Sequence, residues 1–267
     1  MQRQPAVAGQ FYPGSPDRLR QALELLVPSE ATAQAAIAVM APHAGYVYSG
    51  AIAGETYARV EVPDTVVLLG PNHHGIGHPA ALYDEGSWAT PLGVVPIDGA
   101  FAVRLLKRCP DLAADVAAHR LEHSLEVQVP FLQLRNPRFS LVPLCLAHLP
   151  LPNLIAVGEG IGDIVASSAE PVLIVASSDM THYEPGEVAR QKDERALRHV
   201  LDLDPEGLYR TVREGRISMC GVLPTVVMLA AARRLGAVSA SLVRYGNSGD
   251  VTGDQSEVVG YAGVVIS

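Results

Sequence analysis

The chain has 267 residues, 48% of them hydrophobic, and a formal net charge of -8 at pH 7. At this length one hydrophobic core is close to its maximum size, so we expect a single domain spanning residues 1–267. The negative charge and the absence of any run of basic residues argue against nucleic acid as a partner, because phosphate contacts require clustered Lys and Arg.

The sequence also indicates where the protein resides. No uninterrupted apolar stretch reaches about 18 residues, so no membrane-spanning helix is predicted. The N-terminus lacks a basic region followed by an apolar core, so no signal peptide is predicted. The three cysteines, Cys109, Cys145 and Cys220, form no disulfide pattern. These features favour a cytoplasmic protein without a membrane partner.

Short apolar runs alternate with longer segments of helical spacing along the chain. In chain order, the pattern predicts a helix opening at residues 15–17, a strand at 36–41, a helix at 51–60, a strand at 65–69, helices at 100–108 and 124–134, a strand at 139–146, a helix at 154–166, a strand at 172–176, helices at 187–201, 205–213 and 222–235, and strands at 240–245 and 258–266. This alternation predicts an α/β fold with a mostly parallel sheet and helices on both faces. Residues 248–256 are expected to form a surface loop or an active-site lid.

Histidines and an aspartate follow three of the predicted strands. His43 comes after the first strand, His73 and His74 after the second, and Asp179 and His182 after the strand at 172–176. Ligands of open α/β sheets bind beyond the carboxyl ends of the strands, and parallel strands bring those ends to one edge. One histidine after a strand is more often an ordinary loop residue, but three such strand ends favour a shared polar site.

Two further residues precede predicted helices. His123, in Glu122-His123-Ser124, is placed to point into a cleft, although its neighbours could equally act as helix caps. Cys220 precedes the helix at 222–235, whose N-terminus would lower the thiol pKa and favour a thiolate, a strong ligand for iron, zinc or copper. The alternative for Cys220 is a small buried hydrophobic residue.

Five motifs, in order along the chain, resemble those of the Memo family. They are Ala41-Pro42-His43-Ala44-Gly45-Tyr46, Gly70-Pro71-Asn72-His73-His74, Glu122-His123-Ser124-Leu125-Glu126, Ser177-Ser178-Asp179 with His182, and Cys220-Gly221. The opening segment, Ala6-Val7-Ala8-Gly9-Gln10-Phe11-Tyr12-Pro13, is similar to that of the bacterial branch named AmmeMemoRadiSam system protein B. The match runs nearly end to end, and no single motif carries it.

The resemblance implies a fold and a set of metal ligands. The fold would be a three-layer α/β/α sandwich like that of class III extradiol ring-cleaving dioxygenases. The ligands would be His43, His73 and Cys220, at the site where those enzymes hold non-haem iron with two histidines and a carboxylate. Fe(II) is the expected metal, with Zn or Cu as alternatives. Because a thiolate changes the redox potential and is itself oxidisable, dioxygenase chemistry does not follow directly.

The resemblance also assigns roles around the metal. His182 would take the position of the dioxygenase acid/base histidine, and His123 a position beside the substrate. Asp179 would orient a histidine. His74 and Tyr46, which belong to the matching motifs, are expected next to the ligands or the substrate.

Several functions remain open at this point. The first is an iron-dependent redox enzyme acting on an unidentified small molecule, with His182 as the proton acceptor. The others are a metal-assisted hydrolase or lyase, a non-catalytic metal-binding or partner-binding protein, and a metal-free nucleophilic pair of Cys220 and His182. The bacterial branch name suggests a functional link to radical S-adenosylmethionine and AMMECR-type proteins.

Overall fold

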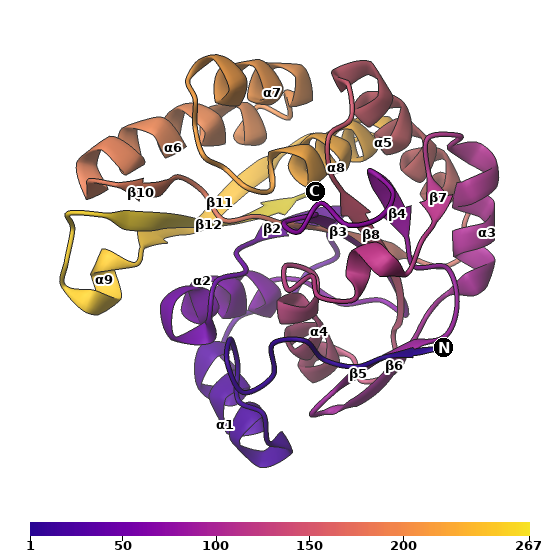
Figure 1. The fold of residues 1–267 in the computed structure, drawn as a ribbon, viewed down its shortest axis with the longest axis horizontal. Helices are drawn as coiled ribbons and strands as arrows, with labels where there is room; N and C mark the ends of the chain where they lie inside the picture. Colours follow the sequence, from indigo (N-terminus) through magenta and orange to yellow (C-terminus); the bar gives the residue numbers. More distant parts are fainter.

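Nine strands form the main sheet of the computed structural model, which describes residues 1–267 (Figure 1). Four parallel strands lie at its centre, in the spatial order β2 (Ala38–Ala41), β9 (Val172–Ser177), β3 (Thr65–Pro71) and β8 (Ser140–Leu146). These strands are the predicted ones, and their burial on both faces explains their continuous apolar sequence.

The outer strands complete the sheet on both sides of this parallel centre. On one side β12 (Val258–Ile266) runs antiparallel to β2 and pairs with β10 (His182–Glu184) and β11 (Ala240–Asn247). On the other side β4 (Ala80–Leu82) runs antiparallel to β8 and pairs with β7 (Ala113–Ala114). A separate three-stranded sheet contains β1 (Gln2–Arg3), β5 (Ser87–Thr90) and β6 (Gly93–Pro96).

Helices cover both faces of the main sheet, which gives the three-layer α/β/α sandwich that was predicted (Figure 1). Alternate residues of β9 show the division, because Leu173 and Val175 belong to the core of one face, and Ile174 and Ala176 to the core of the other. The first core contains residues of α1 (Pro16–Leu26), α2 (Tyr46–Ala58) and α4 (Val129–Arg135). The second contains residues of α3 (Gly99–Arg108), α5 (Leu151–Ala166), α6 (Gly186–Leu201), α7 (Pro205–Glu214) and α8 (Val222–Arg234). None of the helices is both long and apolar enough to cross a membrane.

The structure differs from the sequence-based expectation at several short segments. The helix expected at 124–134 begins only at Val129, after a 3-10 turn at Glu126–Gln128. Its expected first residues instead form a loop, in which the Ser124 amide donates to the Glu122 carboxylate. The segment 248–256 contains one short helix, α9 (Gly249–Thr252). The unpredicted strands, β1, β4 to β7 and β10, have two to four residues each, too few to show a periodic pattern.

The arrangement of the parallel strands positions the candidate site. Ala41 of β2 lies opposite Ser177 of β9, and Leu69 of β3 lies opposite Ala176. The carboxyl ends of these three adjacent strands therefore meet at one edge of the sheet, where the segments carrying the candidate histidines begin.

Candidate metal centre

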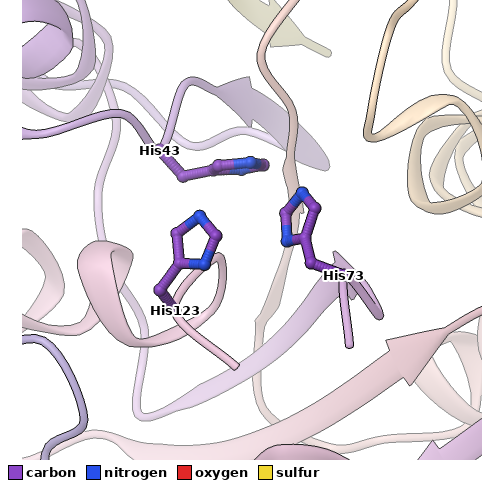
Figure 2. Close-up of side chains that lie close together, drawn as sticks. All are labelled: His43, His73 and His123. Carbon is purple, nitrogen blue, oxygen red and sulfur yellow. The ribbon is translucent and has the colours of Figure 1, made fainter. Parts of the chain in front are cut away.

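Three histidines from separate parts of the chain converge at this edge (Figure 2). His43 follows β2, His73 follows β3, and His123 lies in the loop before the 3-10 turn. One ring nitrogen of each lies within 4.8 Å of the others. The ring centroids of His43 and His73 are 5.4 Å apart, and those of His73 and His123 are 4.6 Å apart. The expected meeting of strand ends is therefore observed, and His123 joins it.

The hydrogen bonds around His43 fix its tautomer. Its Nδ1 lies 2.9 Å from the Ser177 hydroxyl, which donates its only hydrogen to the Ser124 carbonyl oxygen at 2.6 Å. The same hydroxyl accepts a hydrogen bond from the Gln128 side-chain amide. Nδ1 of His43 must therefore be the donor, which leaves the lone pair of Nε2 directed into the site.

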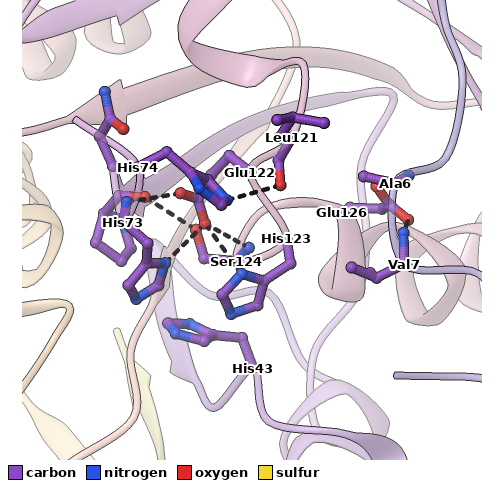
Figure 3. A network of polar contacts seen from close by, with 12 residues as sticks. Ala6, Val7, His43, His73, His74, Leu121, Glu122, His123, Ser124 and Glu126 are labelled. Carbon is purple, nitrogen blue, oxygen red and sulfur yellow. Dashed lines mark hydrogen bonds and ion pairs between the residues drawn. The ribbon is translucent and has the colours of Figure 1, made fainter. Parts of the chain in front are cut away.

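His73 is fixed in the same way by Glu122 (Figure 3). Its Nδ1 lies 2.8 Å from Oε1 of Glu122, and its backbone amide donates to Oε2 at 2.7 Å. Burial raises the pKa of Glu122, but the hydrogen bonds from His73 and Ser124 outweigh it and hold that pKa below its ordinary value. The ionised carboxylate therefore keeps the proton on Nδ1 and leaves Nε2 of His73 free to bind a metal.

The electrostatics of the cluster keep the imidazoles of His43 and His123 neutral. Burial and the charges of neighbouring histidines lower the pKa of His43 well below its ordinary value. Burial is also the main cause that lowers the pKa of His123 to about 4, against the Glu122 carboxylate, which raises it. Neutral imidazole is the form that binds iron, zinc and copper, whereas magnesium and calcium prefer oxygen ligands. The donor set therefore fits a transition metal.

Cys220 lies beside the cluster, just before α8, a helix of the second core. A Cβ atom at Gly221 would lie 2.4 Å from the Ser177 carbonyl oxygen, so glycine is what allows the start of α8 to pack against the end of β9. Sγ of Cys220 then lies 3.3 Å from Nε2 of His43 and accepts a hydrogen bond from the Asp179 amide. Cys220 is outside the three-histidine group but adjacent to it.

The pKa of Cys220 shifts in the direction opposite to the sequence-based expectation. The helix N-terminus was expected to lower it, but burial raises it well above its ordinary value, and the Asp179 carboxylate raises it further. A thiolate at this position therefore requires a bound cation that displaces the proton.

Asp179 and His182 line a cavity of about 490 Å³ together with His123. Asp179 accepts a hydrogen bond from the His43 amide at 2.7 Å, and burial raises the pKa of its carboxyl to about 6. Nδ1 of His182 lies 2.9 Å from the Ser218 carbonyl oxygen, to which it can only donate. Nε2 of His182 is therefore the unprotonated nitrogen of the neutral ring.

The remaining predicted site residues are His74 and Tyr46, neither of which belongs to the three-histidine group. Nε2 of His74 donates to the Leu121 carbonyl oxygen, and the residue lines a different cavity, of about 890 Å³, with His73 and Cys220. The Tyr46 hydroxyl donates to the Val127 carbonyl oxygen, and its ring packs on Phe131 in the first core. The structure thus places Tyr46 in the first core, and Tyr46 lines neither of these two cavities.

Sequence reasoning missed a second layer of contacts that holds the His123 loop. The Arg3 guanidinium pairs with the Glu126 carboxylate at 2.8 Å and donates to the Glu122 carbonyl oxygen at 2.7 Å. Glu126 also accepts hydrogen bonds from the amides of Ala6 and Val7 (Figure 3). The only sequence signal for this network was the position of Glu126 within a matching motif.

Comparison with known proteins places these features in a family. A family model described as Memo-like protein matches residues 3–265. The MEMO1 family protein MK0963 of Methanopyrus kandleri is 42% identical, with 99% of each chain covered, and a MEMO1 family protein of Aquifex aeolicus is 45% identical, with 98% of each covered. An uncharacterized Escherichia coli K12 protein, JW3007, has a similar fold, with a TM-score of 0.57 and 16% identity over 86% of this chain and 99% of its own. The chain therefore belongs to the Memo family.

Proposed function

We propose that this protein is a metal-dependent redox enzyme that binds Fe(II) and acts on a small molecule. The observation that carries the proposal is the convergence of two imidazoles, His43 and His73, whose Nδ1 hydrogens are both committed to neighbouring oxygens. Their Nε2 lone pairs are thereby oriented before any metal binds, which is the arrangement expected of metal-ligating histidines.

Two side chains compete for the third ligand position. His123 belongs to the compact three-histidine group, whereas Cys220 contacts Nε2 of His43. We assign the third position to Cys220, because His123 lines the same cavity as His182 and would there face a bound substrate. Bound iron would supply redox chemistry and open positions for reactants, with zinc or copper as the alternative metals.

The protein's own groups would bind the substrate and accept its proton. His182 would accept the proton at Nε2, since its Nδ1 already donates to the Ser218 carbonyl oxygen. The aromatic side chains of Phe11, Tyr48 and Tyr261 line the cavity and would pack against an apolar or aromatic substrate.

The three-histidine group also supports a second candidate function. Three histidines with an open fourth position are the ligands of some hydrolytic zinc centres, in which the metal lowers the pKa of bound water to about 7. With His123 as the third ligand, the protein would be a metal-assisted hydrolase. The difference between the two candidates therefore depends on whether Cys220 or His123 binds the metal.

Anaerobic purification followed by elemental analysis tests the proposal. One iron per chain and oxygen uptake with members of a panel of phenols are the expected results. Zinc in place of iron, with hydrolysis of ester substrates and no oxygen uptake, would favour the hydrolase. A chain that retains no transition metal after reconstitution would overturn both candidates.

A further inference from the structure

A second cavity reaches the metal centre. It has a volume of about 890 Å³, within the range of pockets that hold small organic molecules, and His73 and Cys220 form part of its wall. The cavity of about 490 Å³ that contains His182 shares no lining residue with it. The candidate ligands therefore face two separate spaces.

The two cavities differ in charge. The larger one is lined by Arg213 and by no aspartate or glutamate, with His74 and His148 as further polar groups. The smaller one carries three acidic side chains, Asp179, Asp254 and Glu257, and no lysine or arginine. Arg213 is therefore the only permanently charged side chain in the lining of the larger cavity.

The polar groups of the larger cavity are free to contact a ligand. Arg213 lies in the last turn of α7, and the ten salt bridges of the structure do not include it. Its guanidinium lies 5.5 Å from the centroid of the Tyr209 ring, which also lines the cavity. Nδ1 of His74 is uncommitted, because its only hydrogen bond is made by Nε2. The Arg213 guanidinium can therefore donate to an oxyanion. Nδ1 of His74 is left as an acceptor, because the hydrogen of that ring is on Nε2.

Part of the remaining lining is apolar and comes from the end of β8, the segment that follows it and the start of α8. Leu146, Leu149 and Leu223 contribute hydrophobic wall, which would cover the carbon skeleton of a ligand. Val222, the first residue of α8, also lines the cavity. The N-terminus of that helix adds partial positive charge to the field of Arg213.

We propose that this cavity binds an organic anion, a carboxylate or phosphate ester with an apolar body, whose charged group contacts Arg213. The body of the ligand would extend along the leucine-lined wall toward Cys220 and His73. Such a molecule would approach the candidate metal centre from a different cavity than the one that His182 lines. The binding site is formed by the protein alone and does not depend on the proposed redox function.

Calorimetric titration of the chelator-treated full-length protein tests this inference. The probes are phenyl phosphate and benzoate, which separate the two anion types, and benzylamine, which has a similar body and the opposite charge. At least one anion should bind, benzylamine should not, and Arg213→Gln should weaken binding about tenfold, the effect of losing about 1.4 kcal/mol. Arg210→Gln is the matched control, because Arg210 is exposed on the same helix but does not line the cavity.

Several outcomes would overturn the proposal. Equal weakening by Arg210→Gln and Arg213→Gln would show general charge attraction rather than a site. Binding of benzylamine as strong as that of the anions, or no binding of either anion at millimolar concentration, would also contradict it. Because the protein is freed of metal, anion binding at the metal cannot imitate the expected result. If the metal-loaded protein takes up no oxygen but the metal-free protein binds the anions, the proposed redox function is contradicted and the anion site is not.

Discussion

The two sides of the histidine cluster are built differently. On one side, the loop that carries Glu122 and His123 is fixed by buried charged groups and by the N-terminal segment. On the other side, Cys220 and His182 are held by fewer contacts and are partly exposed. The first side would orient ligands before a metal binds. The second contains groups whose protonation would have to change during the proposed metal binding or catalysis.

A buried ion pair supports the Glu122 side. The side chains of Arg3 and Glu126 are 3% and 1% exposed, respectively, and every oxygen of Glu126 has a partner. Glu126 also accepts a hydrogen bond from the Tyr12 hydroxyl at 2.6 Å, and the ring of Phe11 lies 4.8 Å from that of His123. The N-terminal segment therefore forms part of the support of the candidate metal centre, although no residue of it is a candidate ligand.

The largest expected effect comes from removing the candidate ligands. His43→Ala, His73→Ala and Cys220→Ser should each lose bound metal, because open catalytic centres use three protein ligands and each variant would leave only two of the proposed set. Metal content per chain, measured by elemental analysis after anaerobic reconstitution, checks this result. Full occupancy in Cys220→Ser would show that the cysteine is only a neighbour of the site.

Matched controls come from the other cysteines and from His123. Cys109→Ser and Cys145→Ser should retain the metal, because both thiols are buried in the hydrophobic cores and the Cys145 thiol is directed to the Pro71 carbonyl oxygen. His123→Ala should also retain it if Cys220 is the third ligand. The reverse pattern, loss in His123→Ala and retention in Cys220→Ser, would assign a three-histidine centre and favour the hydrolase.

The next effect is a loss of stability when the ion pair between Arg3 and Glu126, which supports the loop that carries His123, is broken. Glu126→Gln removes the negative partner of a buried guanidinium, and breaking a buried pair in this way costs about 3–5 kcal/mol. Urea unfolding of the variant should show that loss in the free energy of unfolding. Glu55→Gln is the control, because the ion pair of Glu55 with Arg244 lies at the surface, where such pairs contribute about 1 kcal/mol or less. Equal losses in the two variants would contradict a special role for the Glu126 network.

Glu122→Gln should affect metal affinity more than folding. The amide retains the shape of the carboxylate, but it no longer holds the proton on Nδ1 of His73 by charge. Replacing such a partner of a ligating histidine typically weakens metal binding 10–100-fold. Competition with a chelator of known affinity measures the change. An unchanged affinity, with normal unfolding, would mean that the hydrogen bond to Glu122 does not orient the ligand.

Part of this site could be predicted from the sequence, and the reason is topological. His43, His73 and Asp179 follow apolar strands, and parallel strands place their carboxyl ends together. The contact between Arg3 and Glu126 joins residues separated by 123 positions, and neither lies at the end of a predicted strand. No local pattern could reveal it.

The protonation of Cys220 shows a different limit of sequence reasoning. Its place before a helix is a local fact, and it predicts a lowered pKa. The desolvation and the Asp179 carboxylate that raise the pKa come from the packing of α8 against β9, which is a tertiary fact. Fold class was predictable because it depends on many residues, whereas a pKa depends on a few neighbours.

Acid should destabilise the Glu122 side, and His119 is a specific cause. Its carbonyl oxygen accepts a hydrogen bond from Arg3, and burial lowers the pKa of its imidazole to about 4. The unfolded chain therefore binds a proton below about pH 6.5 that the folded protein does not, so the free energy of unfolding falls as the pH decreases from 6.5 toward 4. His119 alone accounts for about 2 kcal/mol at pH 5. Urea unfolding at pH 7.5 and pH 5 should show a smaller difference in His119→Gln than in the unmodified protein.

The smallest expected effect on metal content, and the sharpest test of the Cys220 side, comes from His182→Ala. Nδ1 of His182 donates to the Ser218 carbonyl oxygen, and the ring lines the cavity rather than belonging to the three-histidine group. The variant should therefore bind metal within about threefold of the unmodified protein, a change of about 0.7 kcal/mol. Once a substrate is found, turnover should fall by about 10²–10⁴-fold, the usual contribution of a proton-transfer group. Metal content measured beside that of His43→Ala decides the first half without a substrate. Equal loss in both variants would make His182 a ligand, close the site to reactants and favour a non-catalytic metal-binding protein.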